Sequence, residues 1–361
     1  MVAGLRHSLL IDAGNVRRIA AEYGISPLMD ELMNRLLQTL STFDDRLFES
    51  PPRDGFGDDG NGLIEWMPIH ERDHTVTLKV VGYHPLNPTS HGLPSVLSSI
   101  SVYDSQSGHL LALADGTFIT AWRTGAMSGV ASRLLAEPGS ATVGLIGCGA
   151  QAVTQLHAVS MAFDIQSVLL HDIDQDRVQT LPERARAFAG PDMMFKSLPP
   201  EEMLAACDII CTSTSNPVGA GPLFEDAETK AWLHINAVGS DFPGKRELPV
   251  SLLKRSLVVA DFLPQAVREG ETQQLHSGTA RIVSLPDIVR HDIAGADYRN
   301  DLTVFDSTGW ALADHVAMAL IVELAVEMDE FRHVQLDNSG FDPYSPYEEL
   351  STPPLAPRIG Y

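Results

Sequence analysis

The chain has 361 residues, of which 44% are apolar and 20% are charged, and its formal net charge is −22. These proportions are typical of globular proteins, and the length suggests two domains at roughly 150 residues each. Such an acidic surface would repel nucleic acid and anionic lipid, so neither is expected as a partner. An acidic protein can still hold an anion where its few cations converge in one cleft.

Two features bear on the cellular compartment. No stretch approaches the roughly 18 uninterrupted apolar residues of a membrane span, and Arg6 and His7 break the N-terminal apolar patch. The three cysteines, Cys148, Cys207 and Cys211, form neither a disulfide framework nor a zinc-site spacing. The sequence therefore predicts a cytoplasmic protein without a metal site.

The first part of the chain predicts a helix followed by a meandering sheet. Leucines that recur at three and four residues predict an amphipathic helix over 26–49, which begins at Ser26-Pro27. A loop rich in Pro, Gly and Asp follows at 51–62. Strand-like runs, separated by turn signals, then occupy 63–67, 75–81, 96–103 and 109–114.

The pattern changes near Pro138-Gly139, where short apolar strands begin to alternate with helical stretches. Strands are expected at 141–147, 168–172, 207–212, 232–235, 256–261 and 302–306. This alternation predicts right-handed βαβ units in a parallel, doubly wound sheet. A long apolar helix is expected at 310–328, followed by an extended arm over 331–361 whose composition gives little to bury.

The predicted fold class is therefore α/β with two domains. A Rossmann-type domain is expected over 138–307. An α+β domain is expected over 1–137.

The most specific local motif is the run Gly147-Cys148-Gly149-Ala150-Gln151-Ala152 between a strand and a helix. It fits a dinucleotide fingerprint, in which glycines allow a tight turn and helix N–H groups hold a pyrophosphate. Asp172 ends the next strand, 20 residues after Ala152, where a carboxylate binds ribose hydroxyls and repels a 2′-phosphate. The pattern predicts NAD. Asp174 is the alternative acid, unless it caps the next helix, and the same turn also occurs in other doubly wound proteins.

Three basic residues fall at strand or helix edges in the first domain: Arg53, Lys79 and Arg123. Burying an unpaired cation is costly, so each needs a partner. A guanidinium fork together with an ammonium suits the carboxylate of an amino acid. The alternative is internal pairing with Glu65 or Asp115.

Two acids are candidates for proton transfer. Glu65 interrupts an apolar strand, where its carboxylate would bind an amine or carry a proton; the alternative is an outward-facing position on an alternating strand. Asp241 lies in a turn after a strand, at the carboxyl edge where parallel sheets bind ligands. A turn aspartate also serves as a local hydrogen-bond acceptor.

Together these motifs resemble the ornithine cyclodeaminase/mu-crystallin family over nearly the whole chain. The matching segments, in the family's order and spacing, are IEWMP (64–68), KVVGYHPLNP (79–88), RTGAMSGVASRLLA (123–136), GCGAQA (147–152), HINAVGSDFPGKREL (234–248), REGETQQL (268–275) and FDSTGWALAD (305–314). The segments GLPSVL, VASRLLAEP, VTQLHAVS and DPY…PPLAP are similar to the branch that forms L-pipecolate.

The resemblance implies an NAD-dependent enzyme that converts L-lysine to L-pipecolate, or L-ornithine to L-proline, with release of ammonia and no net redox change. It implies that Arg53, Lys79 and Arg123 bind the substrate carboxylate, and that Asp241 and Glu65 are catalytic. Contacts with NAD are implied for Ser95, Thr124, Gly147, Gly149, Ala150, Gln151, Asp172, Thr214, Val238, Gly239, Lys245 and Ser307. A homodimer built through the first domain is also implied, as is a chain end that packs back on that domain, so that 308–361 completes it.

Two positions depart from the family pattern: Trp310 stands where a Phe is usual, and Ala313 stands where an acid is common before Asp314. Either was expected to reshape the rim of the pocket. Two other functions fit the same scaffold. One is a cyclic-imine reductase or an amino-acid dehydrogenase such as alanine dehydrogenase. The other is a non-catalytic binding protein like the crystallins, against which the retained charged residues argue.

Overall fold

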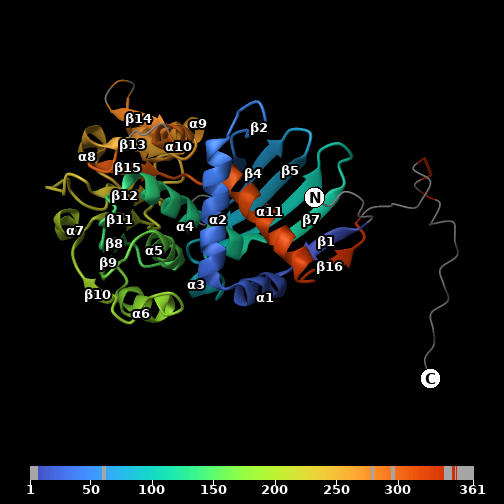
Figure 1. Ribbon diagram of the computed structural model, residues 1–361, viewed down its shortest axis with the longest axis horizontal. Helices are drawn as coiled ribbons and strands as arrows, with labels where there is room; N and C mark the ends of the chain where they lie inside the picture. The colour runs from blue at the N-terminus through green and yellow to red at the C-terminus, as the bar shows by residue number, and fades with distance from the viewer. Residues whose placement is uncertain are drawn as a thin grey trace.

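The computed structural model describes residues 7–58, 62–276, 278, 280–293, 297–336, 344, 345 and 347. The described chain forms two eight-stranded sheets with helices between and around them. Figure 1 shows the sheets on opposite sides of the molecule, with α2 (Ile25–Ser41) running between them. The α/β fold class expected from the sequence is confirmed.

The first sheet is mostly antiparallel. Its central meander, which the turn signals predicted, consists of β4 (Gly62–Glu71), β5 (Thr75–Tyr83), β6 (Val96–Asp104) and β7 (Leu110–Asp115). The outer strands are β16 (Arg332–Val334), β1 (Ser8–Ile11), β2 (Phe48–Glu49) and β3 (Asp54–Asp58). β1 runs parallel to β7, whereas β16 pairs antiparallel with β1. A single turn of helix, α3 (Asn87–Ser90), lies between β5 and β6.

The helices of this half are α1 (Ala13–Tyr23), α2, α4 (Gly116–Leu135) and α11 (Ala311–Glu327). They share one apolar core with the sheet, to which α2 contributes Leu28, Leu32, Leu36 and Leu40. α11 packs on β4 and β5, so the chain returns to the first sheet after completing the second. The predicted domain boundaries at 137/138 and 307/308 stay a prediction.

The helix predicted over 26–49 is too long, because α2 ends at Ser41. The backbone N–H of Thr42 donates to the carbonyl of Gln38 at 3.3 Å. The carboxylate of Asp44 then accepts the backbone N–H of Arg46 at 2.9 Å, which closes a turn before β2. Aspartate competes in this way for backbone donors that a helix would otherwise use. Leu47 is 52% exposed and does not continue the buried stripe.

The second sheet is entirely parallel. Its strands, in spatial order, are β10 (Met194–Ser197), β9 (Ser167–His171), β8 (Thr142–Ile146), β11 (Ile209–Thr212), β12 (His234–Ala237), β15 (Thr303–Asp306), β13 (Leu257–Ala260) and β14 (Arg281–Ser284). Its helices are α5 (Ala150–Ala162), α6 (Gln175–Ala185), α7 (Pro200–Ala206), α8 (Val250–Arg255), α9 (Leu263–Glu269), the 3₁₀ turn η1 (Glu271–Gln274) and α10 (Leu285–Ile293). The strand order reverses between β8 and β11, and such a switch point is where doubly wound sheets bind ligands.

The helix α4 joins the two halves and is buried on nearly every side. It packs against α5 at Gly125, where an added Cβ would lie 2.4 Å from the carbonyl oxygen of Thr154. Farther along, a Cβ at Gly129 would lie 2.5 Å from the terminal methyl of Met33. Small residues therefore allow the close approach of helices that fixes the two sheets relative to each other.

The predicted arm over 331–361 lies mostly outside the described residues. Its first part is not free, since Arg332–Val334 forms β16 at the edge of the first sheet.

Candidate active site

The glycine-rich loop lies at the switch point of the second sheet, between β8 and α5. Gly147 has φ +90°, and a Cβ there would lie 2.7 Å from the carbonyl oxygen of Ser213, so only glycine fits without strain. Gly149 precedes α5, and a Cβ there would meet no atom within 4 Å. No side chain caps α5, which leaves the N–H groups of its first turn, over Ala150 and Gln151, without a side-chain acceptor.

Asp172 follows β9 beside this loop and is 8% exposed. Its two carboxylate oxygens accept the backbone N–H groups of Cys148 at 2.7 Å and Asp174 at 2.9 Å. Asp174 itself caps α6 by accepting the N–H of Asp176 at 3.1 Å. The two acids that the sequence left as alternatives therefore have different local roles, and only Asp172 contacts the glycine-rich loop.

Most of the predicted cofactor residues follow neighbouring strands and share one edge of the sheet. Thr214 comes after β11, Val238 and Gly239 come after β12, and Ser307 comes after β15. Backbone hydrogen bonds continue the parallel pairing past the strand ends, from Val238 N–H to Thr212 and from Ser307 N–H to Ala237, both at 3.0 Å. The structure therefore brings these residues together with Gly147 and Gly149.

A buried carboxylate, Glu247, organises part of this edge. It accepts the hydroxyl of Thr212 at 2.6 Å, the N–H and hydroxyl of Thr214 at 2.7 and 2.6 Å, and the N–H of Gly239 at 3.0 Å. Asp261 has a similar role, because it accepts the hydroxyl of Ser307 at 3.0 Å. The strand-end loops are thus held by internal acceptors.

The remaining predicted cofactor residues lie apart from that edge. Thr124 is buried in α4, and its hydroxyl donates to the carbonyl of Thr120 at 2.8 Å. Ser95 precedes β6 in the first sheet, where its carbonyl accepts the N–H of His84 at 2.8 Å. Lys245 pairs with Asp241, and its ammonium lies 5.3 Å from the ring centre of Tyr83.

This edge fits a dinucleotide. Gly149 leaves open space beside uncapped helix N–H groups, which is the cradle that a pyrophosphate needs. Asp172 places a carboxylate beside the loop for ribose hydroxyls. The candidate residues for holding the pyrophosphate are therefore Gly147 to Gln151.

Lys79 and Arg123 meet on one carboxylate. Lys79 on β5 and Arg123 on α4 reach Asp314 on α11, with Lys79 Nζ to Oδ2 at 2.7 Å and Arg123 Nε to Oδ1 at 2.8 Å. The side chains of Lys79 and Asp314 are each 1% exposed. Burial and the neighbouring guanidinium of Arg123 lower the pKa of Lys79 to about 8. Both cations do pair internally, but with Asp314 rather than with Glu65 or Asp115.

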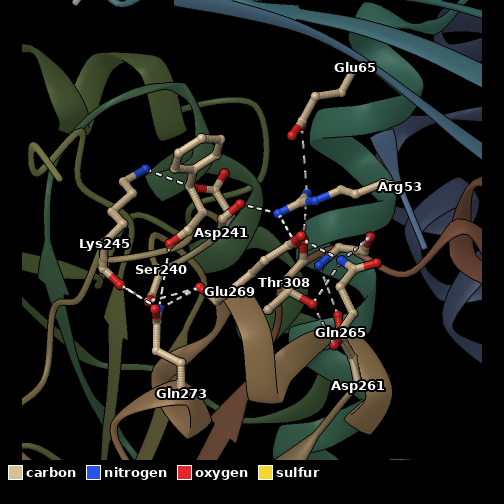
Figure 2. A network of polar contacts seen from close by, with 12 residues as sticks. Arg53, Glu65, Ser240, Asp241, Lys245, Asp261, Gln265, Glu269, Gln273 and Thr308 are labelled. Atoms are coloured by element: carbon tan, nitrogen blue, oxygen red, sulfur yellow. Dashed lines mark hydrogen bonds and ion pairs between the residues drawn. The ribbon is translucent and has the colours of Figure 1, made fainter. Parts of the chain in front are cut away.

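Arg53 links the first half of the chain to the second-sheet loops (Figure 2). Its guanidinium donates to the carbonyl oxygens of Asp241 and, at 3.2 Å, Thr308. It also lies 2.5 Å from the carboxylate of Glu269 and 3.8 Å from that of Glu65. Its side chain is 7% exposed. Of the three predicted carboxylate-binding cations, Arg53 is therefore the one that touches the backbone of Asp241 and pairs with Glu65, as the alternative of internal pairing anticipated.

Asp241 lies in the loop after β12, where its carboxylate contacts Lys245 Nζ at 2.8 Å. The side chain of Asp241 is 45% exposed, so the carboxylate remains reachable by a substrate. Desolvation raises the pKa of Asp241, but the charges of Lys245 and Arg53 outweigh it and leave the pKa below its ordinary value. Asp241 is therefore poised as a base beside two cations.

Glu65 lies on β4, at a position of the alternation that points toward Arg53 (Figure 2). Its side chain is 14% exposed, so the outward-facing alternative is wrong. Burial and the acids Asp241 and Glu269 raise the pKa of Glu65, although Arg53 opposes them. Two acids with opposite pKa shifts thus flank one guanidinium, which is the pattern expected of a proton donor and a proton acceptor.

Two partners of the predicted residues were not recognised as such from the sequence. Glu269 pairs with Arg53, and Asp314 pairs with both other cations. Both lie in segments that match the family, REGETQQL and FDSTGWALAD. Nothing in those segments alone indicates which cation each acid contacts, because the partners are far apart along the chain. Glu269 lies 216 positions after Arg53, and Asp314 lies 235 positions after Lys79 and 191 after Arg123.

Trp310 and Ala313, which depart from the family pattern, are both buried. The Trp310 ring stacks on Phe262 with centres 5.2 Å apart and meets the Phe43 ring edge-on at 4.8 Å. Ala313 lies in the first turn of α11, one position before Asp314. The larger aromatic ring at 310 is therefore accommodated by neighbouring aromatic side chains.

Two kinds of feature are absent from the part of the chain that the structure describes. Within those residues, no group of three or more His, Cys, Asp or Glu side chains could hold a metal ion. The helices described here include none with the length and apolar character to cross a membrane.

The fold and site together define an α/β protein with two sheets, in which a dinucleotide-type sheet edge lies beside a buried cluster of cations and acids. Residues 15–329 match the model of the Ornithine cyclodeaminase/mu-crystallin family. The chain belongs to this family, as its motifs led us to expect.

Three relatives illustrate the similarity. L-lysine cyclodeaminase of Streptomyces rapamycinicus is 39% identical over 341 residues, which cover 92% of this chain and 97% of that protein. A solved structure describing recognition of L-lysine, L-ornithine and L-2,4-diaminobutyric acid by lysine cyclodeaminase is 41% identical, with a TM-score of 0.89 and coverage of 94% and 99%. An archaeal alanine dehydrogenase dimer with bound NAD is 28% identical, with a TM-score of 0.79 and coverage of 92% and 100%.

Proposed function

We propose that the protein is an NAD-dependent cyclodeaminase of basic L-amino acids. Its preferred reaction is conversion of L-lysine to L-pipecolate with release of ammonia, and conversion of L-ornithine to L-proline is the second choice. The observation that carries this proposal is the position of Arg53, which donates to the backbone carbonyl of Asp241 and pairs with the carboxylate of Glu65 at 3.8 Å, in a chain 39% identical to the L-lysine cyclodeaminase of Streptomyces rapamycinicus. It brings a carboxylate-binding cation next to two acids with opposite pKa shifts.

The carboxylate of the amino acid would bind to Lys79, Arg123 and Arg53. Lys79 and Arg123 share Asp314 and so stay close together, while Arg53 pairs with Glu65 and lies within electrostatic range of Lys79. Guanidinium and ammonium groups in a dry site bind a carboxylate with defined orientation. The substrate would thereby present its Cα toward the edge that carries Gly147 and Gly149.

NAD would be held at Gly147 to Gln151, Asp172 and the strand-end loops at Thr214, Val238, Gly239 and Ser307. When bound, NAD would accept the hydride from Cα and later return it, so the reaction is redox-neutral. The solved relative with bound NAD supports this choice of cofactor.

Asp241 would carry the proton transfers at the reacting nitrogen atoms. Ring closure requires a deprotonated side-chain amine, and departure of ammonia requires a protonated leaving nitrogen. The lowered pKa of Asp241 beside Lys245 keeps it ionised, so its carboxylate is free to take the first proton and then return one to the leaving group. Glu65, with its raised pKa, would be the second proton carrier or the partner of the side-chain amine.

The test compares two substrates that differ by one methylene. Purified protein with a trace of NAD should release ammonia from L-lysine and form pipecolate, with no net NADH, and should act more slowly on L-ornithine. A preference of about 10- to 200-fold is the range that one methylene provides. Reduction of a cyclic imine at the expense of NADH, without any cyclic product from either amino acid, would favour the reductase alternative instead.

We also propose a homodimer, formed through the outer face of the first sheet. Phe56, Ile64 and Val80 lie on adjacent strands β3, β4 and β5 and are 75%, 49% and 37% exposed. A contiguous apolar face of this kind usually marks an interface, and the related archaeal alanine dehydrogenase is a dimer. Sedimentation should give twice the chain mass of 39.2 kDa, and Val80→Glu should shift it toward the monomer. A wild-type monomer at micromolar concentration would contradict this proposal.

A cytoplasmic location is the last part of the proposal. It is supported by three buried cysteines that are all free, which is usual in a reducing compartment. Recovery of the native protein in the membrane fraction or outside the cell would contradict it.

A further inference from the structure

The three-way contact of Lys79, Arg123 and Asp314 presents an electrostatic problem that the proposed function alone does not resolve. Two positive side chains, 1% and 6% exposed, are held close enough together to share one carboxylate. Like charges repel strongly away from water, and their repulsion favours loss of a proton from the ammonium. A carboxylate-binding site built from this pair works only while Lys79 stays protonated.

The charged groups that face Lys79 come from every element packed around it. Arg123 on α4 and Arg53 before β3 oppose its charge, whereas Asp314 on α11 supports it. Glu65 on the neighbouring strand β4 also lies within electrostatic range. Asp314 is the acid in direct contact with Lys79, at 2.7 Å. It also lies in the first turn of α11, where the helix dipole favours a negative side chain.

Asp314 uses one oxygen for each cation, which leaves donors on both cations for another carboxylate. Lys79 has three N–H donors, and one is directed at Asp314. Arg123 meets Asp314 through Nε, and no hydrogen bond from its terminal nitrogens is found among the described residues. Those terminal nitrogens lie beneath Gly309, where a Cβ would approach them at 3.2 and 3.3 Å. Glycine at 309 therefore keeps the face of the guanidinium clear.

We propose that Asp314 is a positioning residue: it holds Lys79 charged and beside Arg123, so that the two cations form one fork for the α-carboxylate of the amino acid. The inference rests on the proposed function for the identity of that carboxylate. It adds a positioning role for an acid that does not itself touch the substrate.

The first test is Asp314→Asn. Without the negative charge, Lys79 would titrate below its present pKa of about 8. A fall of one unit would leave about a tenth of Lys79 charged at pH 8 instead of about half. The KM for L-lysine is therefore expected to rise, with a smaller change in kcat. The ratio of variant to wild-type KM should grow between pH 6 and pH 8.5, and in this ratio the titration of the substrate cancels.

The matched control is Glu323→Gln, which removes an acid from an exposed ion pair with Arg35 on the same helix. It should leave the KM for L-lysine at the wild-type value at every pH. A KM ratio for Asp314→Asn that is the same at pH 6 and pH 8.5, or that stays at one, would overturn the proposal.

The second test does not depend on turnover. The chain has five lysines, so ¹³C-lysine labelling gives five Cε resonances, and Lys79→Arg assigns the one of interest. In the wild type this resonance should titrate near pH 8, and in Asp314→Asn it should move to lower pH. An unchanged titration would overturn the proposal. If no diamino acid is turned over at all, the proposed function fails, while this titration still decides the role of Asp314.

A conservative variant covers the case in which Asp314→Asn does not fold. Asp314→Glu keeps the negative charge but moves it by one methylene. Lys79 should then titrate as in the wild type while the KM for L-lysine rises equally at all pH values. A wild-type KM in Asp314→Glu would show that the placement of this carboxylate does not matter and would contradict the positioning role.

Discussion

Replacing Asp241 with Asn is expected to lower kcat for ammonia release by about 10²- to 10⁴-fold, the range usual for loss of a general acid–base group. The substitution keeps the size of the side chain and its place after β12 but removes the ability to exchange a proton. It also leaves Lys245 without its carboxylate partner, at a site whose backbone carbonyl still accepts from Arg53. The rate should be measured as ammonia and pipecolate formed from L-lysine at saturating NAD.

The affinity for NAD distinguishes this role from a structural one. The glycine-rich loop lies after β8 and is held by contacts that do not involve Asp241, so NAD binding measured by calorimetry should change little. Asp226→Asn is a suitable control, because Asp226 is an acid of the same half of the chain, paired with Arg255 at the surface. A large loss of NAD affinity in Asp241→Asn would mean that this acid supports the cofactor site rather than the chemistry.

Replacing Arg123 with Met is expected to raise the KM for L-lysine by about 10- to 100-fold, because a charged hydrogen bond is worth about 1.5–3 kcal/mol. Methionine fills the space of the arginine stem, and Asp314 remains neutralised by Lys79 at 2.7 Å. The fold should therefore tolerate the substitution. Initial rates against L-lysine concentration, at fixed saturating NAD, give the KM directly.

The matched control for this variant is Arg133→Met on the same helix. Arg133 pairs with Asp30 at 2.7 Å near the other end of α4, ten residues along the helix from Arg123. Its loss removes an arginine and an ion pair without touching the proposed carboxylate site, so the KM should stay at the wild-type value. Equal rises of KM in both variants would attribute the effect to the helix instead of to the substrate carboxylate.

The sequence predicted the second sheet better than the first. Alternation of short apolar strands with helices over 141–306 gives a repeated signal, and the parallel sheet follows from it. β1 and β16 were missed because three or four residues are too few to show a period of two. These strands exist through pairing with β7 and with each other, which is a tertiary effect.

The site residues were predicted from motifs and from the family resemblance, whereas their ion-pair partners were found only in the structure. The structure brings Arg53 to the carboxylate of Glu65 and to the backbone of Asp241, and it places Gly147 beside the loop after β11. The sequence could not show that Asp314 joins Lys79 to Arg123, because these residues belong to β5, α4 and α11. Ion pairs across three elements are fixed by packing, so the spacing of these residues along the chain does not predict them.

The chain as a whole has a net charge of −22, but the cations and acids of the site are equal in number. Arg53, Lys79, Arg123 and Lys245 are matched there by Glu65, Asp241, Glu269 and Asp314. An acidic protein has thus concentrated four of its 25 basic residues at the place where an amino-acid carboxylate is expected to bind. The remaining acids would repel nucleic acid and anionic lipid, so the absence of such partners stays an expectation.

The measurement that tests the central proposal most directly is the fate of the Cα hydrogen. L-lysine carrying deuterium at carbon 2 is supplied in large excess over NAD, and the pipecolate formed is examined by mass spectrometry while absorbance at 340 nm is followed. A redox-neutral cyclodeaminase should give pipecolate that retains the deuterium at carbon 2, many products per NAD and no accumulating NADH. Stoichiometric NADH formation, or product without deuterium at carbon 2, would contradict the proposed function.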